Sequence, residues 1–163
     1  MAKVFIGVGS NINREQNIRS AIALLRVRFG ELLLSPVYES EAVGFEGENF
    51  YNLVVALESD LEPQQLTRVL HEIETECGRE RNSRRFAPRI LDLDLLLYDD
   101  YVSDREDLHV PREDIITYAF VLRPLADIAG DLHHPVTGVS YRELWQAFDS
   151  SVQSLWPANL DLD

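Results

Sequence analysis

Two aspartates separated by one leucine have the types and spacing that most directly suggest chemistry. Asp92 and Asp94 lie in the segment Leu91–Leu97, whose other members are all leucines. On a β-strand, residues i and i+2 point to the same face, with Cα atoms about 7 Å apart, so both carboxylates should face away from the leucines. Neighbouring carboxylates repel each other unless a cation or a proton lies between them. The pair therefore predicts a Mg²⁺ site, since Mg²⁺ is typically held by one or two carboxylates and substrate phosphates; two hydrated aspartates on a solvated sheet edge are the alternative.

A cluster of arginines precedes the aspartate pair. Its five members lie within eleven residues: Arg79, Arg81, Arg84, Arg85 and Arg89. Arginine binds phosphate in a bidentate manner and stays charged. Metal-assisted phosphoryl transfer needs a metal that bridges phosphates and cations that take up charge in the transition state. The juxtaposition predicts that chemistry, and an internal salt-bridge network between the arginines and the aspartates is the alternative.

Other chemically suggestive residues give weaker signals. The segment Gly9-Ser10-Asn11 could hold an anion before a helix, but an ordinary turn is the simpler interpretation, and no Walker-type GxxxxGK[ST] pattern occurs in the sequence. Cys77 is the only cysteine, which excludes an intramolecular disulfide and a Cys-based zinc site. His133 and His134 are adjacent, and this spacing favours a surface turn over a metal pair.

Length and charge narrow the class of protein. A chain of 163 residues with 45% apolar residues suits one compact domain, residues 1–163. The net charge of −13 argues against a nucleic-acid-binding surface and against binding to anionic membranes. The apolar run within Met1–Ser10 is too short for a signal peptide or a membrane span, so we expect a soluble cytoplasmic protein. We also expect a monomer, because a domain of this size can bury its own core.

The elements that must position these groups follow one order. Hydrophobic patterning predicts strands at 4–9, 32–40, 50–57 and 90–98, and helices at 14–29 and 63–77. This β-α-β-β-α-β order predicts an α+β, ferredoxin-like sandwich with an antiparallel sheet. Extra C-terminal helices are expected at 115–129 and 141–148, and the tail 156–163 should be loosely held.

The segment Arg85–Leu96 resembles the signature of the 6-hydroxymethyl-7,8-dihydropterin pyrophosphokinase family of the folate pathway. Ile6–Asn11, Tyr51–Glu58 and Phe120–Leu125 extend the resemblance over most of the chain. The ferredoxin-like fold of that family agrees with the predicted element order. The resemblance implies an enzyme that transfers pyrophosphate from ATP to the hydroxymethyl group of a reduced pterin, releases AMP and uses two Mg²⁺ ions.

The resemblance also implies roles for individual residues. Asp92 and Asp94 would hold both Mg²⁺ ions, and Arg79 and Arg89 would act on the transferring phosphates. Asn52 would hydrogen-bond the pterin ring. The remaining nucleotide-binding positions would be Glu74, Arg81 and Arg85, and the remaining pterin-binding positions would be Ser40, Val43, Phe50, Phe86 and Phe120.

The sequence departs from the family's pattern at several of these places. The family usually carries Trp, His and Arg where this chain has Phe86, Arg112 and Tyr118, and a Thr-x-Pro-like segment where it has Ser40-Glu41-Ala42. These departures favour one alternative, a non-catalytic or weakly active pterin- or nucleotide-binding paralogue on the same fold. A ferredoxin-like interaction domain without a ligand is a second alternative, against which the arginine cluster argues.

Overall fold

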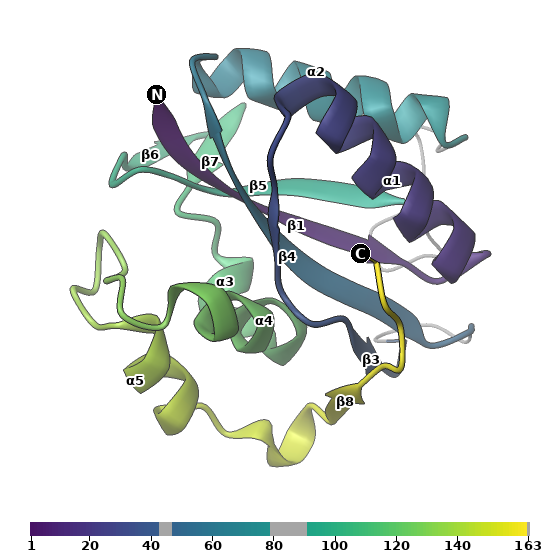
Figure 1. Cartoon of the computed structure of the whole chain (residues 1–163). Helices are drawn as coiled ribbons and strands as arrows, with labels where there is room; N and C mark the ends of the chain where they lie inside the picture. Colours follow the sequence, from purple (N-terminus) through teal and green to yellow (C-terminus); the bar gives the residue numbers. More distant parts are fainter. Residues whose placement is uncertain (43–46, 79–90, 163) are drawn as a thin grey trace.

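An antiparallel sheet forms the centre of the molecule in the computed structural model, which describes residues 1–42, 47–78 and 91–162. The strand order is β5-β1-β4-β3-β8, with β2 paired to β4 (Figure 1). The strands of this sheet are β1 (Ala2–Ser10), β2 (Leu33–Leu34), β3 (Tyr38–Ser40), β4 (Phe50–Ser59), β5 (Asp92–Tyr98) and β8 (Leu155–Pro157). Strands β6 (Ser103–Arg105) and β7 (Leu108–Val110) form a separate two-stranded sheet.

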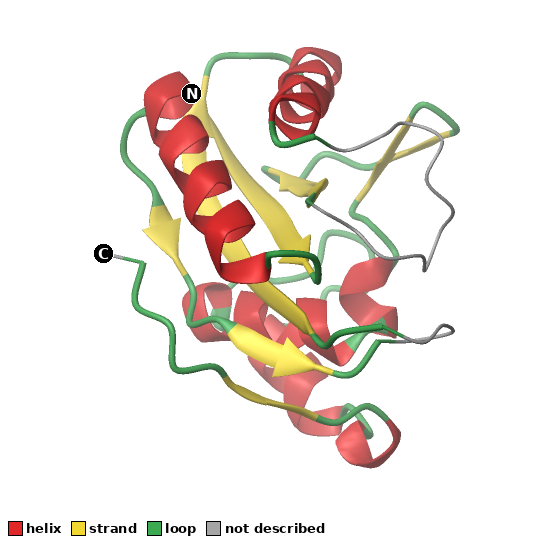
Figure 2. Ribbon diagram, turned by 90° about the vertical axis from the view of Figure 1, so that its right-hand side faces the viewer, coloured by secondary structure: helices red, strands yellow, loops and turns green. Residues whose placement is uncertain are grey.

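Helices cover both faces of the sheet (Figures 1 and 2). Helices α1 (Arg14–Phe29) and α2 (Pro63–Glu76) lie on one face. On the other face lie α3 (Asp114–Thr117), α4 (Ala119–Ala129) and α5 (Tyr141–Ala147), with a 3₁₀ helix at Ser150–Val152. The predicted α+β fold with extra C-terminal helices is thus confirmed. Among the described helices, none has the length and apolar character to cross a membrane.

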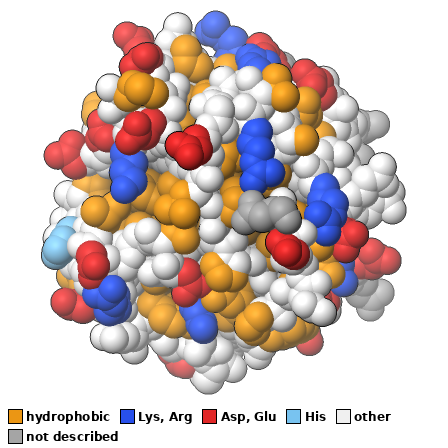
Figure 3. Space-filling view, in the orientation of Figure 1, with side chains coloured by type: hydrophobic (Ala, Val, Ile, Leu, Met, Phe, Trp, Pro, Cys, Tyr) orange, Lys and Arg blue, Asp and Glu red, His pale blue; other side chains and the backbone are white. Residues whose placement is uncertain are grey.

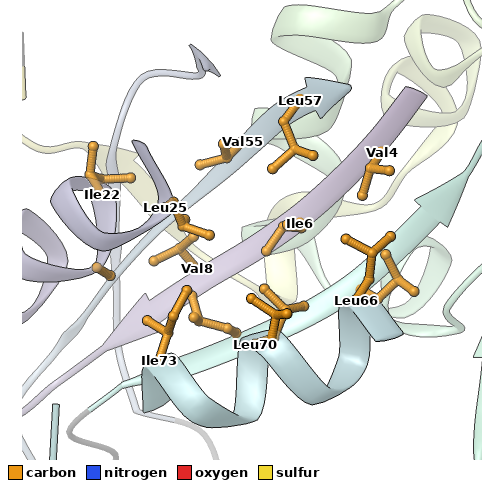
Figure 4. Packing of buried hydrophobic residues seen from close by; sticks show 14 of the residues in the cluster. Val4, Ile6, Val8, Ile22, Leu25, Val55, Leu57, Leu66, Leu70 and Ile73 are labelled. Carbon is orange, nitrogen blue, oxygen red and sulfur yellow. The ribbon is translucent and has the colours of Figure 1, made fainter. Parts of the chain in front are cut away.

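The first hydrophobic core lies between the sheet and helices α1 and α2 (Figure 4). Val4, Ile6 and Val8 alternate along β1 and point toward Leu25 of α1 and Leu70 of α2. Burying each such side chain stabilises the fold by about 1.5–3 kcal/mol relative to its exposure. The intervening residues of β1, which include Gly7 and Gly9, point to the opposite face of the sheet.

A β-bulge in the pairing of β1 with β5 changes which side chains reach the second core. Leu95 pairs with Ile6 and Leu97 pairs with Phe5, so Leu96 is the extra residue. Leu96 and Leu97 therefore both join the core formed with α3, α4 and α5, whereas Leu95 stays on the first face. The simple alternation of β5 thus ends after Leu96, and a bulge increases the local twist of a strand.

Two predicted elements are interrupted in the structure. The strand expected at 32–40 is divided into β2 and β3, because Pro36 has no N–H to continue the ladder and the Ser35 hydroxyl accepts the Val54 N–H at 2.8 Å instead. The helix expected at 115–129 is broken at Tyr118, whose φ of −120° and ψ of 127° are extended. The side chain of Gln153 stabilises this break by accepting the Ala119 N–H and donating to the Thr117 carbonyl.

The expectation of a loosely held C-terminal tail was wrong. Trp156 pairs with Glu39 of β3, and the Ala158 N–H donates to the Val37 carbonyl at 2.9 Å. Leu160 and Leu162 then pack against the first core. Edge-strand pairing and apolar contacts from far along the chain hold the tail in place.

Candidate active site

The sheet register places the predicted site residues in one row. Gly9 of β1 pairs with Asp92 on one side and with Asn52 on the other. Residues directly opposite in an antiparallel pair share a face, so Asp92 and Asn52 both point toward the face covered by α3 and α4. Strands lie about 4.8 Å apart, which separates the Cα atoms of Asp92 and Asn52 by about 10 Å. Asp94 lies in the next row, opposite Gly7.

The glycine in the middle of this row gives the Asn52 side chain its space. A Cβ built on Gly9 would lie 2.6 Å from Asn52 Oδ1, well inside contact distance. A Cβ on Gly7 would meet only Leu96 side-chain carbons at 3.5 Å or more, which is ordinary contact. Asn52 is buried, at 8% exposure, so its amide has little freedom to withdraw. The absence of a side chain at Gly9 therefore leaves the room that the Asn52 amide occupies.

A cavity of about 520 Å³ opens over this face, a size typical of small-molecule sites. Arg112 is the only Lys or Arg among the described residues that line it. Six carboxylates line the same cavity: Glu41, Glu74, Asp92, Asp94, Glu113 and Asp114. On the face of the molecule seen in Figure 3, by contrast, acidic and basic side chains are intermixed. Among the described lining residues, negative charge is thus in excess, which favours cation binding.

The aspartate pair has the electrostatics of a cation site. Burial, followed by the neighbouring Asp92 carboxylate, raises the pKa of Asp94 to about 8, and Arg112 opposes this rise. A carboxylate that is costly to ionise alone is stabilised when a cation approaches it. Within the described ranges, no group of three or more His, Cys, Asp and Glu side chains has the arrangement of a metal site. Two oxygen ligands on one face are the pattern of a Mg²⁺ site completed by phosphates and water, so the residues fit this ion.

Glu74 acts on the backbone between the two aspartates. Its carboxylate is buried and accepts the Leu93 N–H at 2.8 Å. Strand β5 is at the edge of the sheet, where an unpaired N–H would otherwise remain. Glu74 lines the cavity, as its predicted nucleotide-binding role requires, but its contact with the strand was not anticipated. A buried acidic residue on the inner side of a helix was the signal that could have indicated it.

Aromatic rings line the same cavity. Phe50 comes from β4 and Phe120 from the first turn of α4. Tyr118 stacks on Phe120, with ring centroids 5.0 Å apart and an interplanar angle of 18°. The sequence identified Tyr118 only as a replaced arginine, whereas the structure shows that it adds an aromatic surface to the site.

All the described site residues that the sequence predicted converge on this cavity. Those that line it are Ser40, Phe50, Asn52, Glu74, Asp92, Asp94 and Phe120. The other candidates lie outside the described residues: Val43, Arg79, Arg81, Arg84, Arg85, Phe86 and Arg89. The residue expected to begin the fourth strand, at position 90, lies outside them as well.

A network that sequence reasoning missed holds both ends of segment 41–49. Arg14 lies 3.1 Å from the Glu39 carboxylate and donates to the Asn49 carbonyl at 2.9 Å. The Asn49 amide donates to Glu39 at 3.1 Å, and this bond, together with Arg14, holds the pKa of Glu39 below its ordinary value. The Arg14 guanidinium also lies 3.9 Å from the centre of the Tyr51 ring. These contacts join the end of β3 to the start of β4 beside the cavity.

Sequence comparisons identify relatives over most of the chain. The profile of the 7,8-dihydro-6-hydroxymethylpterin-pyrophosphokinase (HPPK) family matches residues 5–130. The 2-amino-4-hydroxy-6-hydroxymethyldihydropteridine pyrophosphokinase of Porphyromonas gingivalis is 38% identical, over 82% of this chain and 95% of that protein. The enzyme of the same name from Pseudomonas aeruginosa is 40% identical, over 82% and 84%. The folic acid synthesis protein fol1 of Pneumocystis carinii is 36% identical over 94% of this chain, which spans only 21% of that longer protein.

Solved structures show the same fold in larger chains. An HPPK-DHPS structure in complex with substrates has a TM-score of 0.72 at 12% identity, covering 90% of this chain and 43% of that one. Wild-type HPPK-DHPS of Plasmodium falciparum has a TM-score of 0.70 at 14% identity, covering 89% and 44%. This chain thus corresponds to less than half of those proteins, and at such identities the likeness concerns the fold alone. With the family profile matching most of the sequence and the close relatives matching along nearly their whole length, the chain belongs to the 7,8-dihydro-6-hydroxymethylpterin-pyrophosphokinase family.

Proposed function

We propose that this protein transfers pyrophosphate from ATP to 6-hydroxymethyl-7,8-dihydropterin and releases AMP, as a step of folate synthesis. The hydroxymethyl oxygen forms a bond to the β-phosphorus of ATP, the bond from that phosphorus to the oxygen shared with the α-phosphate breaks, and the hydroxyl proton is lost. The observation that carries this proposal is the row formed by Asp92, Gly9 and Asn52. It provides an oxygen-ligand site and a hydrogen-bonding amide about 10 Å apart, on one face of one cavity.

The pterin half of the site is assigned to residues of β3, β4 and α4. The Asn52 amide offers both a donor and an acceptor, which suits the edge of a pterin ring. Phe50 and Phe120 supply apolar ring surfaces for stacking a flat heterocycle. Ser40 pairs with Phe50 across the sheet and lines the same cavity. Val43 and Phe86 complete the proposed pterin site.

The nucleotide half is assigned to the carboxylate pair and the arginine cluster. Asp92 and Asp94 would hold two Mg²⁺ ions, which when bound neutralise phosphate oxygens. Arg79 and Arg89 would stabilise charge on the transferring phosphates. Glu74 would keep the strand that carries both aspartates in place while lining the nucleotide site, together with Arg81 and Arg85. We further propose that residues 1–163 act as one domain, as a monomer and in the cytoplasm.

An AMP-release assay tests the proposal. The protein is incubated with ATP, Mg²⁺ and 6-hydroxymethyl-7,8-dihydropterin, and AMP and pterin pyrophosphate are quantified. Asp92→Asn and Asp94→Asn should lose nearly all turnover, whereas Asp104→Asn, a matched change on exposed β6 outside the cavity, should retain it. Wild-type turnover in either site variant would contradict the metal assignment. Binding of both substrates without AMP release would instead support the non-catalytic alternative.

A further inference from the structure

Arg112 lies beside one carboxylate of the proposed metal site and beside a second carboxylate at the start of α3. Its Nη2 is 3.5 Å from Asp94 Oδ1, and its Nε is 3.3 Å from Asp114 Oδ2. Its backbone N–H donates to the Leu96 carbonyl at 3.0 Å. The backbone of Arg112 is thus fixed to β5 two residues beyond Asp94, and its side chain bridges that strand to the start of α3.

These ion contacts are loose. Charge-assisted N–H···O bonds between arginine and carboxylate are typically about 2.7–2.9 Å long, and both contacts of Arg112 are longer. Its Nε is buried and, among the described residues, makes no hydrogen bond of good geometry. A buried donor without such a partner is costly. The guanidinium is therefore positioned to compensate charge without being fixed in one arrangement.

Arg112 is also the only described Lys or Arg that lines the cavity, which contains six carboxylates. The guanidinium of an arginine stays protonated in proteins. Arg112 therefore carries a full positive charge whenever the cavity is free of metal. A divalent cation that binds Asp94 must approach the same oxygen as this guanidinium, and the two positive charges repel each other.

We propose that Arg112 is an internal counter-ion for the ionised Asp94 carboxylate in the metal-free protein and is displaced from it by the divalent cation. After displacement, the guanidinium remains beside Asp114 and faces the cavity, where it can contact phosphate oxygens of the nucleotide. Arg112 is then a positioning residue that competes with the metal before it assists nucleotide binding. This inference rests on the proposed Mg²⁺ site at Asp92 and Asp94.

Calorimetric titration with Mg²⁺ alone, at one alkaline pH for every variant, tests the competition. Arg112→Gln should bind Mg²⁺ about tenfold more tightly than wild type, which corresponds to about 1.4 kcal/mol. Arg112→Lys, which keeps the charge, should stay close to wild type. Arg105→Gln is the matched control, because Arg105 is exposed and pairs only with Asp107 among the described residues. Adding Asp94→Asn to Arg112→Gln should abolish the gain, which would locate the ion.

Thermal unfolding distinguishes a counter-ion from a merely structural residue. At the same alkaline pH, Arg112→Gln should have a lower Tm than wild type without metal, and saturating Mg²⁺ should remove the difference. An equal loss of Tm with and without Mg²⁺ would overturn the inference. It would also be overturned if wild type bound Mg²⁺ and Arg112→Gln bound the ion no more tightly. If wild type itself bound no Mg²⁺, alone or with a non-hydrolysable ATP analogue, the proposed metal site would fall and the counter-ion role with it.

Discussion

Replacing Gly9 with alanine tests whether the row of site residues acts as a unit. The new methyl group would lie 2.6 Å from Asn52 Oδ1, so the amide must withdraw by about 0.4–0.8 Å to restore a contact of 3.0–3.4 Å. A displacement of about 1 Å in a positioning group can cost about 100-fold in activity. We therefore expect pterin affinity to fall by about 10–100-fold.

The stability of this variant should change far less than its affinity. Alanine in a strand interior is favoured over glycine by about 0.5–1 kcal/mol, and forcing Asn52 off its rotamer costs about 0.5–1.5 kcal/mol. The two effects nearly cancel, so the free energy of unfolding should stay within about 1 kcal/mol of wild type. Binding and stability are thereby separated in a single substitution.

The assay is a calorimetric pterin titration in the presence of Mg²⁺ and a non-hydrolysable ATP analogue, combined with denaturant unfolding. Gly7→Ala is the matched control, because Gly7 lies on the same face of the same strand and its new methyl group would only touch Leu96. The control should bind pterin as wild type does. Wild-type pterin affinity in Gly9→Ala, or an equal loss in Gly7→Ala, would refute the reasoning.

Three further substitutions test the Asp94 carboxyl, the hydrogen bond to the Leu93 backbone and the proposed contact of Arg89 with phosphate. The pKa of Asp94 is raised to about 8 in the folded state. The metal-free protein should therefore lose stability as pH rises from about 4 to 8, because folding holds a proton on Asp94 that the unfolded chain releases. In thermal unfolding measured against pH, Asp94→Asn should lack this part of the decline in Tm. Glu74→Leu leaves the Leu93 N–H without its acceptor and should lower the free energy of unfolding by about 1–3 kcal/mol, whereas Glu74→Gln, which keeps an acceptor, should lose less in the same denaturant assay. Arg89→Ala should lower kcat by at least about 100-fold while changing ATP affinity little; single-turnover kinetics with an unchanged chemical step would contradict this.

Local periodicity made much of the fold predictable. The apolar spacing of residues 14–29 and 63–77 indicated the two helices that became α1 and α2, and each ends within a residue of its predicted position. The alternation around Asp92 and Asp94 indicated correctly that both side chains share a face. These signals depend on the repeat of one element alone, and so they can be recognised in the sequence.

Interruptions and long-range pairings had no such signal. The break at Tyr118 is stabilised by Gln153, which lies 34 residues from Ala119. Strand β8 forms because β3 offers an unpaired edge, and its own residues around Trp156 have no distinctive alternation. Contacts of this kind depend on which distant segment arrives at a position, and that information is absent from any local window.

In the site, too, the sequence predicts which face of the sheet a residue occupies but not which residue it pairs with. Period-two patterning tells which face a residue occupies, but it does not tell which residue on the next strand stands opposite. Gly9 was predicted as the last residue of the strand at 4–9, and Gly9-Ser10-Asn11 was interpreted as a turn or an anion-binding segment before a helix; the structure keeps Gly9 in β1 and extends that strand to Ser10. Gly9 pairs with both Asp92 and Asn52, so its lack of a side chain acquires a purpose: the proposed metal carboxylate and the proposed pterin amide can face one cavity with no side chain between them. The proposed function thus uses a residue that contributes no chemical group, and only the pairing of three strands identifies it.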